Sequence, residues 1–335
     1  MKKILFVFLL FLYSTSVFAG YGGYIGKYDN RRYGSLSEPE YNSVVKLTMD
    51  RGIRCTGGFI SKDLILTNNH CMLSCQHGCT AEFWNGSKYE ISNAKIISFD
   101  PKAHGFSGSD WGLLVSDKES NFYKPIAPIS TPGQVFRGGY GVLRVINDDE
   151  IPFLKQIYSQ TIEEFKEDCN KQKNVVYAEC INKHVDEKLK QMNKKILFGD
   201  MGNFKVQTCR ILGNYEQDKR LLKTDCDGAG GDSGAPLLRN DTIVGLNVGG
   251  LQMVFGTDEV NARALKTENF YPYTTYVIKK HEDIDSLENN FAVSRKSENN
   301  NKSSLGPLRP ESGPENTDNA VSETIQQILQ DFDCD

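Results

Sequence analysis

Short β-type runs of hydrophobic residues, broken by Gly, Asn and Asp, follow one another along the chain from Val44 onward. They read VVKLTM, GGFIS, LILTNN, YEISNAKIISF, WGLLVS and, after Tyr140, GVLRVI. Runs of this length with turn residues between them are typical of strands in antiparallel sheets. Their spacing predicts sheets closed into barrels, and not alternating strands and helices.

The pattern changes near Asn147. Residues 151–197 are rich in Lys, Glu, Gln and Asn, and their apolar residues recur at helical intervals, which predicts one or two helices. These apolar positions are Phe153, Ile157, Ile162, Phe165, Val185, Leu189 and Met192. β-type runs return at FKVQTCRILGNY, TIVGLNVGGLQMVF and YPYTTYVIKK. We therefore predict an all-β domain over 44–286 that contains a helical insertion at 147–198.

The N-terminal residues have the form of an export signal. Two lysines precede an apolar run that ends at Tyr13, and Val17-Phe18-Ala19 resembles a cleavage site, so residues 1–19 are predicted to be a signal peptide. The apolar run has about ten residues, whereas a bilayer span needs roughly 20. We expect a secreted or periplasmic protein with no membrane anchor after cleavage, and an N-terminal segment or propeptide at 20–43.

Composition separates the C-terminal tail from the rest. Residues 287–335 are dominated by Ser, Asn, Glu, Pro and Gly, which predicts disorder over 294–318, with a short amphipathic helix at 320–332. The whole chain of 335 residues is 39% hydrophobic and 24% charged, with a net charge of -4. The length suits one main domain with appendages, and the charge gives no sign of a nucleic-acid partner.

Three segments carry residues suited to nucleophilic catalysis. They are CTGGFIS to LTNNHC, which contains His70, then SDWGLL, which contains Asp110, and GGDSGAP, which contains Ser233. A serine hydroxyl is nearly inert at neutral pH, so it needs an imidazole as base. The imidazole in turn needs a carboxylate that fixes its tautomer and stabilises its protonated form. Together the segments predict a nucleophile, a base and an orienting acid.

These motifs and their order resemble those of trypsin-like serine peptidases. IGKYDNRR and IVGLNVGG resemble segments of the bacterial secreted members that include the glutamyl endopeptidases, and the resemblance spans roughly residues 25–280. It implies two antiparallel six-stranded β-barrels and an endopeptidase that acts on proteins or peptides without cofactor or metal. Ser233 would form an acyl-enzyme, with His70 as general base and Asp110 behind it.

The glycine-rich run before Ser233 suits an oxyanion hole, because glycine tolerates the required backbone turn. By resemblance, the donors are the amides of Gly231 and Ser233. Asp232 stands where the family receives a newly cut N-terminal ammonium. Ile25-Gly26 and Tyr33-Gly34 are candidate new termini, so proteolytic activation is a hypothesis.

Substrate preference is predicted from positions flanking Ser233. Asp227 lies six residues before it, at the offset of the pocket acid that pairs with Arg or Lys of the substrate, although a turn-capping role is equally compatible with the sequence. Ala229 replaces the family's pocket cysteine. Asn247 replaces the His of the Glu-specific relatives, and it is assigned to substrate binding with Gly249 and Gly250.

Nine cysteines in an exported chain predict disulfides, with one left over. The resemblance implies a Cys55–Cys71 bond beside His70. We also propose the pairs Cys75–Cys79, Cys169–Cys180 and Cys209–Cys226, with Cys334 unpaired. An alternative is a zinc site formed by Cys71, Cys75, His77 and Cys79.

Two rival functions remain at this point. Ser233, Asp258 and His281 occur in the order of an α/β-hydrolase, but Ala235 replaces the second glycine of the nucleophile elbow that this fold requires. The second rival function is that of a catalytically inactive double-barrel protein that only binds a partner. The intact set of His, Asp and Ser argues against it.

Overall fold

The computed structural model describes residues 24–25, 28–49, 52–76, 78–98, 107–172, 177–200, 202–250, 255–257 and 262–281. The expectations for the signal peptide, for the tail at 287–335 and for Cys334 lie outside these residues. So do His77 and Asp258.

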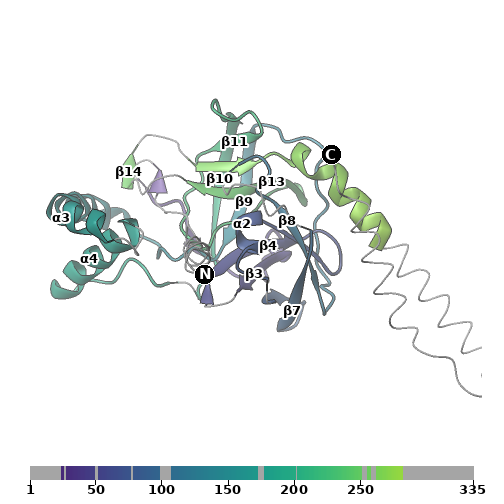
Figure 1. Cartoon of the computed structure of the whole chain (residues 1–335), viewed down its shortest axis with the longest axis horizontal. Coiled ribbons are helices and arrows are strands. Elements are labelled where there is room, and N and C mark those ends of the chain that lie inside the picture. Colours follow the sequence, from purple (N-terminus) through teal and green to yellow (C-terminus); the bar gives the residue numbers. More distant parts are fainter. Residues whose placement is uncertain are drawn as a thin grey trace, which may run out of the picture. The chain divides into compact units, whose positions relative to one another are not determined.

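The first barrel is a closed ring of six antiparallel strands in the order β3-β4-β5-β8-β7-β6 (Figure 1). Along β6 buried residues alternate with half-buried ones, as expected when one face of a strand lines a core. Phe59 and Phe83 meet edge to face inside it, with ring centroids 4.9 Å apart. The strands are β3 (Val44–Thr48), β4 (Arg54–Phe59), β5 (Leu64–Thr67), β6 (Cys79–Trp84), β7 (Tyr89–Ser98) and β8 (Gly112–Ser116).

The second barrel also closes, because β10 pairs with both β9 and β11. A short strand, β2 (Arg32–Tyr33), adds to the start of β10. The six strands are β9 (Gly133–Gly139), β10 (Lys205–Asn214), β11 (Leu221–Thr224), β12 (Pro236–Arg239), β13 (Thr242–Gly250) and β15 (Ala262–Leu265). The predicted all-β double barrel is confirmed, and it is incompatible with an α/β-hydrolase.

Two helices form the predicted insertion, α3 (Ile151–Lys171) and α4 (Tyr177–Gln191), which lie side by side in Figure 1 after a short 3-10 turn, η2 (Asp148–Glu150). The pair has its own core, which includes Ile157, Val185 and Leu189, whereas Met192 is exposed. No helix in the described ranges is both long and apolar enough to cross a membrane.

The strand expected after Tyr140 is absent from the described structure, and the neighbouring strand is β9, which the sequence pattern missed. The amide of Val142 donates to Gly230 O (2.8 Å), and that of Arg144 donates to Leu197 O (3.0 Å). The run GVLRVI therefore bonds to Gly230, in the loop that carries the predicted nucleophile Ser233 (the nucleophile loop, residues 225–235), and to the end of the insertion, and it forms no strand. Its apolar residues fill the core of the insertion.

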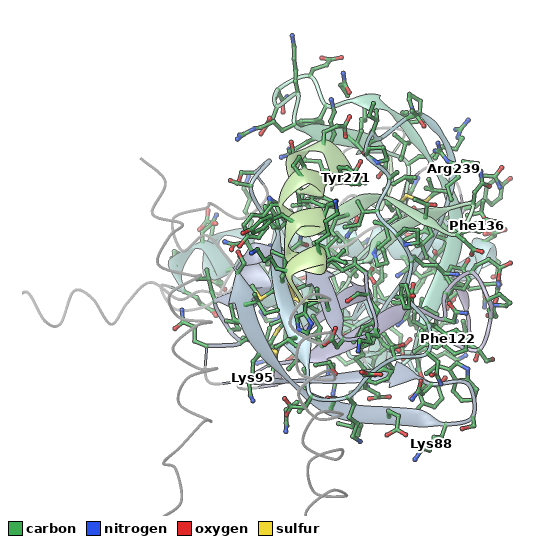
Figure 2. The ribbon with its side chains drawn as sticks, turned by 90° about the vertical axis from the view of Figure 1, so that its right-hand side faces the viewer. Lys88, Lys95, Phe122, Phe136, Arg239 and Tyr271 are labelled. Carbon is green, nitrogen blue, oxygen red and sulfur yellow. A yellow bond between two sulfur atoms is a disulfide. The ribbon has the colours of Figure 1, made fainter. Side chains whose placement is uncertain are left out.

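The predicted strand at YPYTTYVIKK is also wrong, because residues 271–281 form a helix that follows η3 (Thr267–Asn269). Figure 2 labels Tyr271 at its start. Aromatic and β-branched residues favour strands. Here the side chains of Tyr273, Val277 and Ile278 recur at helical spacing and pack on the barrel core, so tertiary packing overrides the local preference.

Two remaining short strands, β1 (Tyr24–Ile25) and β14 (Phe255–Thr257), pair in parallel. The N-terminal segment is thereby connected to the region that follows β13.

A first prediction concerns the disulfide that joins the two insertion helices. Cys169 and Cys180 are 11 positions apart, so replacing both with Ala should lower the free energy of unfolding by about 2–3 kcal/mol through chain entropy. The matched Cys75→Ala/Cys79→Ala variant opens a loop of separation 4 and should lose less. Urea titration of the three proteins measures the difference, and an equal or greater loss in the second variant would contradict the prediction.

Candidate active site

The three predicted catalytic residues lie in loops or short turns that flank strands of both barrels. His70 lies on α2 (Asn69–Met72), directly after β5, and Asp110 lies two residues before β8. Ser233 lies in the loop between β11 and β12 of the second barrel. The first barrel thus supplies the base and the acid, and the second supplies the hydroxyl.

His70 and Asp110 are tied together by two hydrogen bonds. Nδ1 of His70 lies 2.8 Å from Oδ2 of Asp110, and the His70 amide donates to Oδ1 (2.9 Å). Asn68 fixes the backbone of Asp110 through Nδ2 (2.8 Å to O). Asp110 is completely buried, whereas the His70 side chain retains 13% exposure. The imidazole therefore has a fixed orientation and is still reachable from outside.

Thr56 on β4 joins the loop that carries Ser233 to the first barrel. Its amide donates to Ser233 O (2.8 Å), and its hydroxyl donates to Gly231 O (2.8 Å) and accepts from the Tyr140 amide (3.2 Å). Its carbonyl accepts the hydroxyl of Thr67 (2.7 Å). One buried threonine therefore holds the nucleophile loop from both sides of Asp232.

No hydrogen bond from the Ser233 hydroxyl occurs within the part of the chain that the structure describes. Ser233 and His70 are connected through the first barrel, because Ser233 O accepts the Thr56 amide and a disulfide joins Cys55, next to Thr56, to Cys71, next to His70. Catalytic hydrogen bonds are commonly long in ligand-free sites and shorten with substrate. The arrangement suits a hydroxyl that meets the imidazole on substrate binding.

The amides of Gly231 and Ser233 donate no hydrogen bond to any described residue, whereas the amides around them are engaged. Asp232 N donates to Ala229 O (3.0 Å), and Gly234 N donates to Asn247 O (2.9 Å). Gly231 has φ +98°, and a side chain there would approach Tyr140 O to 2.6 Å. Two neighbouring amides are therefore available for an oxyanion, in a turn that requires glycine.

Asn247 lies on β13 and donates hydrogen bonds to the loop that carries Ser233. Its Nδ2 donates to Asp232 O (2.9 Å), and its amide donates to Ala235 O (2.8 Å). Gly249 and Gly250 follow it at the end of the strand and pair with β15. The structure thus brings Asn247 to the loop of Ser233, and its predicted contact with substrate stays a prediction.

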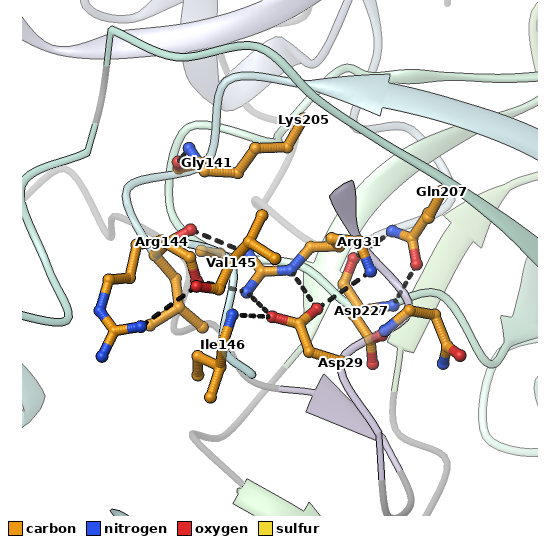
Figure 3. Close-up of polar contacts among 12 residues, drawn as sticks. Asp29, Arg31, Gly141, Arg144, Val145, Ile146, Lys205, Gln207 and Asp227 are labelled. Atoms are coloured by element: carbon orange, nitrogen blue, oxygen red, sulfur yellow. Dashed lines mark hydrogen bonds and ion pairs between the residues drawn. The ribbon is translucent and has the colours of Figure 1, made fainter. Parts of the chain in front are cut away.

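Asp227 is completely buried behind this loop. Oδ2 accepts the Asn30 amide (2.9 Å), and the backbone of Asp227 exchanges hydrogen bonds with the Gln207 amide group (2.5 and 3.0 Å). Figure 3 shows Asp227 beside Arg31 and Gln207. The side chain of the predicted pocket acid therefore also holds the N-terminal segment.

The N-terminal segment is fixed by a buried ion pair next to Asp227 (Figure 3). Arg31 binds Asp29 (2.8 Å), and its guanidinium also donates to Leu143 O (3.0 Å) and Arg144 O (2.9 Å). The motif DNRR therefore connects the segment before the first barrel to the chain that leaves β9.

Lys205 is a second buried cation near the site. Nζ donates to Gly141 O (2.8 Å) and Asp200 O (2.9 Å) and pairs with the Asp200 carboxylate (3.2 Å). Burial lowers the pKa of the Lys205 ammonium, and the attraction of Asp200 opposes this effect. Lys205 thus fixes the backbone at Gly141. The preceding residue, Tyr140, has its carbonyl oxygen close to Gly231.

The cysteines form the four predicted disulfides, Cys55–Cys71, Cys75–Cys79, Cys169–Cys180 and Cys209–Cys226. The sulfurs of Cys71, Cys75 and Cys79 are therefore bonded to other sulfurs. The structure favours the disulfide interpretation over a zinc site.

Sequence reasoning missed Thr56, Gln207 and Arg137, all of which contact the loop of Ser233 or its flank. Thr56 belongs to the motif CTGGFIS, but its role follows only from a partner 175 positions away. No local pattern marks the other two.

Comparison with known proteins gives one family match and several similar solved structures. Residues 34–144 match the family model described as Trypsin. A solved Glu endopeptidase in complex with MPD is 17% identical (TM-score 0.46) over 74% of this chain and 96% of its own. Neuropsin, a serine protease expressed in the limbic system of mouse brain, is 13% identical (TM-score 0.48) over 74% of this chain and 98% of its own. No curated protein matches the chain.

A second prediction tests how tightly the nucleophile loop lies on the first barrel. Gly234 has φ +80°, and a methyl group there would collide with Thr56 O and the hydroxyl of Thr67. Gly52 has a similar φ of +74° with open space around it. Gly52→Ala should cost about 1–2 kcal/mol of stability from backbone strain, and Gly234→Ala at least about 3 kcal/mol from strain plus collision. Urea unfolding measures both, and equal losses would contradict the close approach.

Proposed function

We propose that this chain is an exported endopeptidase of the trypsin-like kind, which cleaves proteins or peptides through an acyl-enzyme on Ser233, and the match of residues 34–144 to the family model described as Trypsin supports this. The observation that carries the proposal is the bonded pair of His70 and Asp110, together with a Ser233 loop in which the amides of Gly231 and Ser233 donate to none of the described residues. This combination supplies a base and an oxyanion site around a single hydroxyl.

The proposed steps follow from the positions of these groups. Asp110 holds the proton of His70 on Nδ1, which leaves Nε2 to accept the proton of the Ser233 hydroxyl as it attacks the carbonyl carbon. The negative charge that develops on the carbonyl oxygen is stabilised by the amides of Gly231 and Ser233. The intermediate expels the amine, which takes the proton from His70. Water, deprotonated by the same imidazole, then releases the acid product.

Export is proposed from the disulfides together with the predicted signal peptide. Four disulfides in one chain are typical of proteins that fold in an oxidising compartment. Residues 1–19 supply the route, and the substrates would be extracellular or periplasmic proteins.

For specificity we propose a preference for Arg or Lys before the scissile bond, with Asp227 as the acid of the pocket. Its offset from Ser233 and its charge support this role. The hydrogen bond from the Asn30 amide to Oδ2 supports a structural role for the same carboxylate. The two roles predict different effects on peptide cleavage when Asp227 is replaced with the neutral Asn.

A third prediction tests the nucleophile. A fluorophosphonate probe should label the wild-type protein and fail to label Ser233→Ala, because the probe traps an activated serine hydroxyl. The matched control is Ser109→Ala, which removes a hydroxyl one residue before Asp110 and should be labelled like wild type. Labelled protein is quantified by intact mass. Labelling of Ser233→Ala, or none of the wild type, would refute the proposal.

A fourth prediction tests the specificity. If Asp227 pairs with the substrate, Asp227→Asn should reduce kcat/KM for peptides with Arg or Lys before the cleaved bond by roughly 10- to 100-fold, while other peptides are cleaved unchanged. A peptide-library cleavage profile of both proteins measures this. A uniform loss over all peptides would assign Asp227 to the N-terminal segment alone. Cleavage after Glu in the wild type would also refute the basic preference.

A further inference from the structure

The carboxylate next to the nucleophile is buried and fully engaged. Oδ1 of Asp232 accepts the Gly141 amide (2.7 Å), and Oδ2 accepts the Ala229 amide (2.9 Å). Side chains at Gly139 or Gly141 would collide with this carboxylate. Asp232 therefore fixes the turn that presents the amides of Gly231 and Ser233.

A buried carboxylate of this kind requires a counter-charge, and Arg137 on β9 supplies it. The guanidinium lies 2.7 Å from Oδ2 of Asp232, and the two side chains are only 2% and 5% exposed. NH1 of Arg137 also donates to Asp227 O. One side chain thus bridges the start of the nucleophile loop to the residue next to Ser233.

The other buried cations in this region have carboxylates of their own. Arg31 is paired with Asp29, and Lys205 with Asp200. Both cations are attracted to Asp232 at longer range, but their ion pairs are with Asp29 and Asp200. Removing Arg137 would therefore leave Asp232 without its ion-pair partner, a change that costs several kcal/mol in a buried site.

We propose that Arg137 is a positioning residue that holds the oxyanion-hole loop in its active form, so that the peptidase needs no newly cut amino terminus. This inference rests on the proposed function. The pair forms as β9 docks on β10 and β12 during folding, because Arg137 pairs with Gln207 and Leu237 in the sheet. The counter-charge for the Asp232 carboxylate then comes from Arg137 and not from an ammonium released by proteolysis.

The N-terminal segment agrees with this proposal. The chain is continuous from residue 28 into β2, the Asn30 amide is bonded to Asp227, and the Arg31 guanidinium is buried. Tyr33 pairs with Lys205 through β2 and donates its hydroxyl to Asp200 (2.9 Å). A cut before Tyr33 would disrupt contacts that already brace the site.

The fifth prediction compares Arg137→Met with wild type in the full chain. Loss of the counter-charge should misplace the two amides and lower kcat by roughly 10²- to 10³-fold, the effect of losing an oxyanion-hole donor in comparable hydrolases, with KM changed much less. Arg137→Lys should recover part of kcat because it keeps the charge. The control is Arg210→Met on the neighbouring strand, whose exposed ion pair with Asp225 lies away from the site and whose kcat should equal that of wild type.

A second arm keeps Arg137 in place and changes only the N-terminus, so it does not depend on the Arg137 variants folding. A protein whose N-terminus carries a non-cleavable extension, checked by mass to be intact, should match the unextended protein in kcat and in fluorophosphonate labelling rate. Activity that appears only after N-terminal cleavage would overturn the inference. So would unchanged kcat in folded Arg137→Met. Labelled wild type with either of these results leaves the proposed function intact, whereas unlabelled wild type overturns both.

Discussion

The hydrogen bonds between Thr56 and the loop of Ser233 join the two halves of the site. Each barrel closes on itself, so neither one needs the other to satisfy its strands. The predicted base and the predicted nucleophile nevertheless come from different barrels, and a displacement of 1 Å between such groups is enough to reduce catalysis strongly. Thr56 is buried, bonds to Gly231, Ser233 and Tyr140, and has a short, stiff side chain, so it restricts that displacement.

Charges behind the loop serve a different purpose. Three buried cations near this loop pair with carboxylates, namely Arg31 with Asp29, Arg137 with Asp232 and Lys205 with Asp200. Buried ion pairs contribute little net stability compared with apolar packing, because both charges lose hydration. Their guanidinium and ammonium groups instead bind backbone carbonyls of loops that have no sheet partners, such as those of Leu143, Gly141 and Asp227. They give irregular segments a defined position.

The sequence was informative where structure is decided locally and uninformative where it is decided by distant partners. Strand runs such as LILTNN and the motifs around His70, Asp110 and Ser233 are contiguous, so the barrel class and the candidate site could be predicted. The helix at 271–281 could not, because its β-favouring residues are overridden by packing on the barrel core. Arg137 could not either, since its partner Asp232 is 95 positions away and an arginine in a strand carries no local signal.

The helical insertion shows how such long-range coupling reaches the nucleophile. It interrupts the connection between β9 and β10, yet Gly139 still pairs with Lys205 across it, because its two ends meet where the Asp200 amide donates to Val142 O (3.0 Å). Closing a long loop costs little more than closing a shorter one, and the helices bury their own apolar faces. Their core also includes Ala229, whose amide binds the Asp232 carboxylate. Packing inside the insertion is thereby connected to the turn that carries the proposed oxyanion-hole amides, so the insertion is structurally continuous with the loop of Ser233 and not an independent appendage.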